Sequence, residues 1–220
     1  MAKFLKRSIK RKKGLRFQGG LEVEELDSPV TRCRPADCIE HICESTNFSR
    51  KEIQLMYRTF KQDCPSGAVY EETFRLIYSQ FFPHGDASRY ASYVFKAFDE
   101  QNCGCLSFDE FIKSLSLLTR GTAGDKLRWA FKLYDINKDG VITKEELQEI
   151  VASVHKLLGR SYSPGSNGIA TEKLMEMHTS KIFQKLDSNG DGVVTLEEFL
   201  DACLQDETIS LSLDLLESSF

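Results

Sequence analysis

Apolar residues recur at helical spacing in four stretches of the chain, and a short polar segment interrupts each stretch. In three of them, thirteen residues separate the last apolar residue before the polar segment from the first one after it. These pairs are Phe98 and Phe111, Tyr134 and Leu147, and Leu186 and Phe199. An apolar period of about 3.6 residues on both sides of a polar segment predicts a helix-loop-helix unit that is repeated along the chain.

The polar segment at residues 135–146 alternates oxygen-bearing side chains in a pattern that suits a hard cation. Asp135, Asn137 and Asp139 occupy positions 1, 3 and 5, and Glu146 occupies position 12. This is the spacing of an EF-hand loop, in which position 7, here Val141, contributes its backbone carbonyl and position 6 is a glycine. Calcium takes about six to eight oxygen ligands, so the sequence predicts a calcium site here.

The segment at residues 187–198 repeats the same chemistry at the same spacing. Its ligands would be Asp187, Asn189, Asp191, Val193 and Glu198. In both segments position 9 is a threonine three residues before the closing glutamate, which is a capping box that starts the following helix. An isolated acidic loop is usually a solvated turn, but two complete loops with matching apolar flanks predict two calcium sites.

The segment at residues 99–110 keeps part of this pattern. Asp99 and Glu110 occupy positions 1 and 12, whereas Gln101 is at position 3 and Cys103 at position 5. A thiol is a soft ligand that suits calcium poorly. Two interpretations are open for Asp99 and Glu110: weak binding of calcium or magnesium, or a loop with a structural role only.

The first unit has lost the calcium chemistry. Fourteen residues, rather than thirteen, separate Phe60 from Phe74, so one residue is inserted. Position 1 is then Lys61 or Gln62, and Pro65 stiffens the middle of the loop. We expect this unit to bind no calcium and to serve as a scaffold for its neighbour.

A single helix-loop-helix unit cannot bury its own apolar face, so EF-hands pack in pairs around a shared core. Four units therefore predict an all-α fold of four EF-hands in two lobes, with short antiparallel strand pairing between the loops of each pair. We place the lobes at residues 46–119 and 126–205. Between them, Gly121 and Gly124 suggest a hinge.

The charge is unevenly distributed along the chain. The formal net charge is −4, yet residues 1–16 carry eight lysines and arginines and no acidic residue. Residues 1–45 are expected to form a basic, partly disordered extension, with a short helix starting near Pro35. Its cations, interleaved with apolar residues, suit an anionic membrane surface or nucleic acid, and a solvated arm is the alternative.

Composition indicates a soluble, mostly helical protein of the cell interior. With 41% hydrophobic and 28% charged residues, the 220-residue chain can bury two cores without disulfides. Seven cysteines without a zinc-like framework favour reduced thiols. No apolar run is long enough to span a bilayer, and no nucleophile with its base or phosphate loop is recognisable, so we do not expect an enzyme.

Several stretches resemble the neuronal calcium sensors, the family that contains recoverin and frequenin. They are "CPSG" in the first unit, "QFFPHGDAS" after it, "LLTRGT" at the connector and "DKLRWAFKLYDINKDG" at the third loop. The stretch "NFSRKEIQLMYRTFKQDCPSG" is most similar to the potassium-channel-interacting proteins, also called calsenilins. The resemblance covers about residues 45–210. Because the chain begins Met-Ala rather than Met-Gly, we expect no N-terminal myristoylation.

The resemblance implies a calcium sensor with ions in the third and fourth loops and an apolar groove on the N-terminal lobe for a partner helix. The sequence offers a surplus of large apolar residues there: Phe74, Ile77, Tyr78, Phe81, Phe82, Phe111 and Leu115. The alternative is that all of them are core. The implied partner is the cytoplasmic N-terminal helix of a Shal-type voltage-gated potassium channel subunit, and the implied location is the cytoplasm, peripheral to the plasma membrane through that partner.

Two other function classes are open. One is a sensor for a kinase, cyclase or receptor tail, as recoverin and frequenin are. The other is a calcium-regulated transcriptional repressor whose basic extension contacts DNA, which salt-dependent binding to a specific duplex would mark. A simple calcium buffer is disfavoured, because buffers need no surplus apolar groove.

Residues 206–220 predict one more amphipathic helix. Its apolar stripe consists of Ile209, Leu213, Leu216 and Phe220. A short helix is only marginally stable alone in water, so we expect it to cover the apolar groove until a partner helix displaces it. The alternative is permanent packing on the C-terminal lobe.

Overall fold

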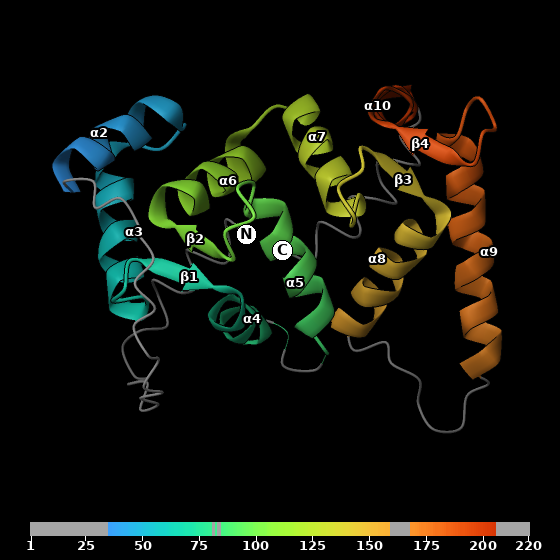
Figure 1. Cartoon of the computed structure of the whole chain (residues 1–220), viewed down its shortest axis with the longest axis horizontal. Coiled ribbons are helices and arrows are strands. Elements are labelled where there is room, and N and C mark those ends of the chain that lie inside the picture. The colour runs from blue at the N-terminus through green and yellow to red at the C-terminus, as the bar shows by residue number, and fades with distance from the viewer. Residues whose placement is uncertain (1–34, 81, 83–84, 159–167, 206–220) are drawn as a thin grey trace.

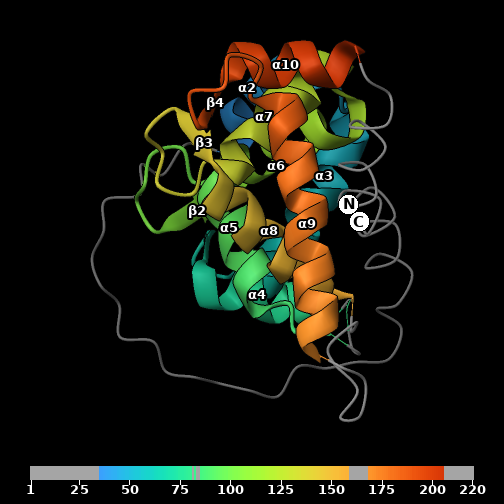
Figure 2. The same ribbon diagram turned by 90° about the vertical axis from the view of Figure 1, so that its right-hand side faces the viewer.

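The structure is a computed structural model that describes residues 35–80, 82, 85–158 and 168–205. The described part is mostly helical, with two short antiparallel strand pairs (Figures 1 and 2), which confirms the predicted fold class. Residues 1–34, which make up most of the predicted basic extension, lie outside the described residues, and so does the predicted amphipathic helix at 206–220.

The N-terminal lobe consists of two helix-loop-helix units and a preceding helix. Its elements are α2 (Pro35–Ser45), α3 (Arg50–Asp63), β1 (Ala68–Tyr70), α4 (Glu71–Ser79), α5 (Ser88–Phe98), β2 (Cys105–Ser107) and α6 (Phe108–Arg120). The helix expected near Pro35 is therefore present as α2. It packs on this lobe rather than extending away from it, since Ile42 is fully buried in the core.

The C-terminal lobe repeats the arrangement. Its elements are α7 (Ala123–Tyr134), β3 (Val141–Thr143), α8 (Lys144–Leu157), α9 (Gly168–Leu186), β4 (Val193–Thr195) and α10 (Leu196–Gln205). In Figure 1 this lobe is the yellow-to-red half, and it lies beside the blue-to-green N-terminal lobe.

Each lobe joins its two loops through one strand pair. The pair β1–β2 is antiparallel and sets Val69 opposite Leu106, and the pair β3–β4 sets Ile142 opposite Val194. All four of these residues are buried, because the centre of each short strand points into the core of its lobe. The predicted pairing of loops within a lobe is thus present in both halves of the structure.

The connector between the lobes is shorter than the sequence suggested. Helix α6 ends at Arg120, with Gly121 as its C-cap, and α7 begins at Ala123. Thr122 and Asp125 form a capping box that starts α7 early, so Gly124 lies inside the first helical turn. Only Gly121 and Thr122 separate the two helices.

The two lobes pack directly on each other through α5, α7 and α8 (Figure 1). Phe98, at the end of α5, packs on the buried Trp129 of α7 with ring centroids 5.8 Å apart. The Tyr93 hydroxyl of α5 donates a hydrogen bond to the Glu149 carboxylate of α8 at 2.5 Å. The apolar residues of the two lobes therefore form one contiguous core.

A second contact between the lobes explains part of the "FPHGDAS" stretch. The Asp86 amide donates to the Lys156 carbonyl at the end of α8, with a donor–acceptor distance of 3.0 Å. Beside it, the Gly85 backbone lies so close to α8 that a Cβ atom would be 1.9 Å from the Leu157 carbonyl oxygen. Glycine is required at position 85 because any side chain would separate the two backbones.

An ion pair at the start of α3 predicts a pH-dependent term in stability. Ser49 and Glu52 form the predicted capping box, and Glu52 also accepts a hydrogen bond from the Arg120 guanidinium at 2.5 Å. Mainly because of Arg120, and then Ser49, the pKa of Glu52 falls to about 2 from an ordinary value of 4.5. The pair is partly exposed, so its contribution should be at most about 1 kcal/mol.

A carboxylate whose pKa is lower in the folded state than in the unfolded state stabilises the protein at pH values above its unfolded-state pKa. This stabilisation is lost as the pH falls through the folded-state pKa. The difference in unfolding free energy between the wild type and Glu52→Gln should therefore be largest at neutral pH and shrink between about pH 4.5 and 2. Urea unfolding across this pH range measures it. A difference that does not change with pH would show that the ion pair contributes nothing.

Candidate metal centre

The third loop begins where α7 ends. Asp135 is the C-cap of that helix, and its carboxylate accepts hydrogen bonds from the Asp139 amide at 3.1 Å and the Gly140 amide at 3.0 Å. The Asn137 side-chain oxygen also accepts from the Asp139 amide, at 2.8 Å. Gly140 adopts φ +89°, the left-handed turn that position 6 requires. The backbone thus orients the ligands at positions 1, 3 and 5 from inside the loop.

Glu146 joins the two ends of the third loop. One carboxylate oxygen accepts from the Ile136 and Asn137 amides at 3.1 and 3.2 Å. The other accepts from the Thr143 amide and hydroxyl at 2.9 and 2.8 Å. Thr143 is the N-cap of α8, so the residue that closes the loop also begins the helix.

Burial makes the carboxylates of the third loop favourable ligands for a cation. Asp135 is only 8% exposed and Glu146 only 9%. Burial raises the pKa of Asp135 above its ordinary value, against the opposing effect of the Gly140 and Asp139 amides. Burying a carboxylate is unfavourable unless opposite charge compensates it, and a divalent cation would supply that charge.

The fourth loop has the same design with a more exposed closing residue. The Asp187 carboxylate accepts from the Gly190 and Gly192 amides at 2.8 and 3.0 Å. Glu198 accepts from the Thr195 amide at 3.0 Å and from the Ser188 hydroxyl at 3.0 Å. The hydrogen bonds from Thr195 are the main cause that lowers the pKa of Glu198 to about 2. Glu198 is therefore ionised across the physiological pH range.

The ligand sets of both loops fit calcium. Each loop offers three carboxylates, one amide oxygen and the backbone carbonyl of Val141 or Val193, all hard oxygen donors. In the described part of the chain no three His, Cys, Asp or Glu side chains converge closely enough to hold a metal by themselves. Carboxylates repel one another, and in each loop backbone N–H groups hold them in place by hydrogen bonds. The side-chain oxygen of the asparagine and the backbone carbonyl oxygen of the valine would complete the ligand set.

The second loop keeps the frame of a calcium loop with fewer oxygens. The Asp99 carboxylate accepts from the Cys103 and Gly104 amides at 3.0 and 2.8 Å, as Asp135 does in the third loop. Glu110 forms a capping box with Ser107. Position 5 is a thiol, so whether Asp99 and Glu110 bind a weak calcium or magnesium ion stays a prediction.

The first loop differs from the third loop. Ala68 pairs with Ser107 as Val141 pairs with Thr195, which makes Ala68 position 7 and Gln62, one of the two predicted residues, position 1. Helix α3 nevertheless continues through Gln62 to Asp63. The helix ends instead with Cys64 as C-cap, whose amide donates to the Phe60 carbonyl at 2.7 Å. The inserted residue lengthens the helix rather than the loop. Only residues 65–67 separate Cys64 from β1, whereas residues 136–140 separate Asp135 from β3 in the third loop.

A lysine occupies the shortened first loop. The Lys61 ammonium donates to the Pro65 carbonyl at 3.1 Å and would lie 3.4 Å from a Cβ atom at Gly67. The loop therefore places a protein cation where the other loops present oxygens to a metal. This geometry agrees with the prediction that the first unit is a scaffold.

Contacts between the second and third loops were not foreseen from the sequence. The Lys138 ammonium, from position 4 of the third loop, donates to the Asp99 carbonyl at 3.2 Å and to the Asn102 side-chain oxygen at 2.5 Å. Lys132 of α7 forms an ion pair with Glu100 at 2.5 Å. No period or motif signals these contacts, because they depend on how the lobes pack.

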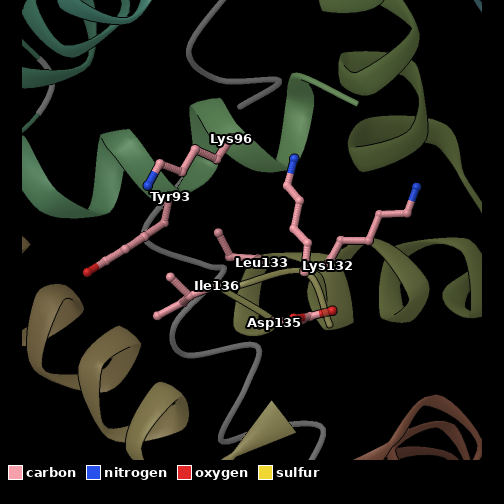
Figure 3. Close-up of a pocket in the computed structure, with 7 residues that line it drawn as sticks. Tyr93, Lys96, Lys132, Leu133, Asp135 and Ile136 are labelled. Carbon is pink, nitrogen blue, oxygen red and sulfur yellow. The ribbon is translucent and has the colours of Figure 1, made fainter. Parts of the chain in front are cut away.

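A shallow pocket lies at the same junction. Figure 3 shows residues that line it: Tyr93 and Lys96 come from α5, Lys132 and Leu133 from α7, and Asp135 and Ile136 from the start of the third loop. Asp135, the first predicted calcium ligand of the third loop, therefore lines the boundary between the lobes.

The residues predicted to bind a partner divide into two groups. Phe74, Tyr78 and Leu115 are buried in the core, whereas Ile77, Phe82 and Phe111 are half-buried, and Phe82 and Phe111 pack against the core. Phe81 lies outside the described residues. Leu76 of α4, which the sequence reasoning did not single out, is 58% exposed.

A family model described as an EF-hand domain pair matches residues 125–204. This range begins in α7 and ends in α10, and it contains the third and fourth loops with all ten of their predicted ligands. The C-terminal lobe is thus an EF-hand pair, and EF-hand pairs bind calcium. Such pairs typically belong to sensors rather than enzymes. In the described part of the chain, no helix is both long and apolar enough to cross a membrane.

Proposed function

We propose that the protein is a calcium sensor that binds an amphipathic target helix on an apolar surface of its N-terminal lobe. The observation that supports this most is the EF-hand pair at residues 125–204, whose third loop contains buried carboxylates at its first and last ligand positions. Two buried carboxylates in one loop favour a divalent cation, because the cation would balance their negative charge.

The contacts between the lobes support a sensor rather than two independent domains. Calcium binding would draw Glu146 toward the ion, and Glu146 lies in the first turn of α8. The other end of α8 contacts Gly85 and Asp86 of the N-terminal lobe. Movement of α8 would therefore affect both the metal loop at one end and the loop that follows α4 at the other. Helix α8 would thus be the two-state element that a sensor needs.

The target we propose is the cytoplasmic N-terminal helix of a Shal-type, A-type voltage-gated potassium channel subunit. The protein would then act in the cytoplasm, peripheral to the plasma membrane through this partner. The half-buried Ile77, Phe82 and Phe111 provide partly exposed apolar surface, whereas Phe74, Tyr78 and Leu115 are buried in the core. An amphipathic helix binds such surfaces through apolar side chains at helical spacing.

A peptide with the sequence of the channel N-terminal helix tests this proposal. Phe111→Ala or Ile77→Ala should weaken its binding to the full chain by roughly tenfold, because truncating a contact at the centre of an interface costs more than about 1 kcal/mol. Leu204→Ala is the matched control, since Leu204 is an exposed apolar residue of α10 on the other lobe. Isothermal titration in calcium and in chelator provides the measurement.

If the channel peptide does not bind in either condition, the target is wrong, whereas calcium sensing is tested separately. Binding to a kinase, cyclase or receptor tail instead would identify the second function class. Salt-dependent binding of the full chain to a specific DNA duplex would identify the repressor.

A further inference from the structure

The second loop contains two thiols that face each other. The Cys103 and Cys105 sulfur atoms lie 3.4 Å apart, and only Gly104 separates the two residues in sequence. Cys103 is exposed and Cys105 is half-buried. The pair is therefore open to a small oxidant from solvent through Cys103.

A disulfide requires the two sulfurs to come closer than they are in the structure. A disulfide bond is about 2.0 Å long, so the sulfurs must approach by roughly 1.4 Å. Gly104 adopts φ +74°, and no atom lies within 4 Å of the place where a Cβ would be. The space beside the turn between the two cysteines is therefore open.

We propose that Cys103 and Cys105 form an intramolecular disulfide when a hydroperoxide oxidises the protein. The exposed Cys103 thiol attacks the peroxide ROOH, becomes a sulfenic acid and releases the alcohol ROH. The Cys105 sulfur then attacks the Cys103 sulfur and forms the S–S bond. The displaced hydroxide takes the Cys105 proton and leaves as water, so two electrons have passed from the sulfurs to the peroxide. A dithiol reductant reverses the modification.

The disulfide would alter the loop at metal-binding positions. Cys103 and Cys105 occupy loop positions 5 and 7. The Cys103 thiol lies 2.9 Å from the Cys105 carbonyl oxygen and 3.6 Å from an Asp99 carboxylate oxygen, and it can donate to either. Oxidation removes this donor, so the oxygens at positions 1 and 7 lose a hydrogen-bond partner. The modification also lies beside Asn102, which Lys138 of the third loop contacts.

Peptide mapping of the oxidised full chain tests the proposal. Trypsin cleavage after Lys96 and Lys113 releases residues 97–113, in which Cys103 and Cys105 are the only cysteines. The reduced protein is treated with one equivalent of hydrogen peroxide, blocked with iodoacetamide and digested. We expect this peptide to carry no alkyl group and to be two hydrogen atoms lighter than the reduced peptide, and dithiothreitol should restore double alkylation.

The variants Cys103→Ser and Cys105→Ser should each abolish this product, and Cys43→Ser, which changes a half-buried cysteine of α2, should leave it unchanged. Three results would overturn the proposal. They are a doubly alkylated peptide after peroxide treatment, a cross-link from residues 97–113 to another peptide, and a sulfinic acid at Cys103 without a disulfide.

Discussion

The variant Glu146→Gln is expected to lose calcium at the third loop while the fourth loop still binds. Glu146 supplies both carboxylate oxygens of position 12, and glutamine provides one weaker neutral oxygen in their place. Loss of a residue that merely supports a metal ligand weakens metal affinity by roughly 10–100-fold, so loss of the bidentate ligand itself should exceed this. A calcium titration monitored by calorimetry measures the affinity of each site.

The same variant should remain folded. Glutamine can replace glutamate in a capping box with Thr143, so the start of α8 is retained. Glu145→Gln is the matched control, because it removes the same charge from the neighbouring, exposed position of α8. Glu198→Gln should produce the corresponding loss at the fourth loop. Unchanged affinity in Glu146→Gln would mean that the third loop does not bind calcium through position 12.

The variant Gly85→Ala should destabilise the packing of the lobes. The added Cβ would lie 1.9 Å from the Leu157 carbonyl oxygen. The oxygen is part of the backbone and the Cβ is bonded to it, so neither atom can move aside without a shift of the main chain. Separating these segments also stretches the hydrogen bond between the Asp86 amide and the Lys156 carbonyl. Insertion of a methyl group into a packed contact costs about 1–3 kcal/mol, and we expect the free energy of unfolding to fall by this amount.

Urea unfolding monitored by tryptophan fluorescence measures this effect, because Trp129 is the single tryptophan of the chain and packs between the lobes. Gly124→Ala is the matched control. Gly124 lies in the first turn of α7, where a Cβ would meet the Arg128 guanidinium only at 3.6 Å. That variant should be unchanged or slightly more stable. Equal unfolding free energies for the two variants would contradict the close contact at Gly85.

The features that the sequence predicted correctly depend on short-range chemistry. The capping box of Thr143 with Glu146 follows from residues within one repeated unit, and the pairing of β3 with β4 follows from two neighbouring copies of that unit. A local pattern forms the same structure wherever it occurs, provided that its apolar flanks can pack. The four-unit, two-lobe organisation therefore followed from the repeat.

The features that the sequence missed depend on tertiary packing. The inserted residue in the first unit could extend the helix or lengthen the loop. The pairing of β1 with β2 fixes the end of the loop at Ala68, and α3 extends to Asp63. The Lys138 contact with the second loop also joins residues 36 and 39 positions apart. Burial of Phe74 and Leu115 likewise depends on neighbours distant in sequence.

The central claim is that the third and fourth loops bind calcium in the range in which a sensor works. Calorimetric titration of the full chain with calcium at neutral pH tests it most directly. The account predicts two sites with dissociation constants of roughly 10⁻⁷ to 10⁻⁵ M, and no third site of comparable strength. Four sites of similar affinity, or no binding in this range, would contradict it.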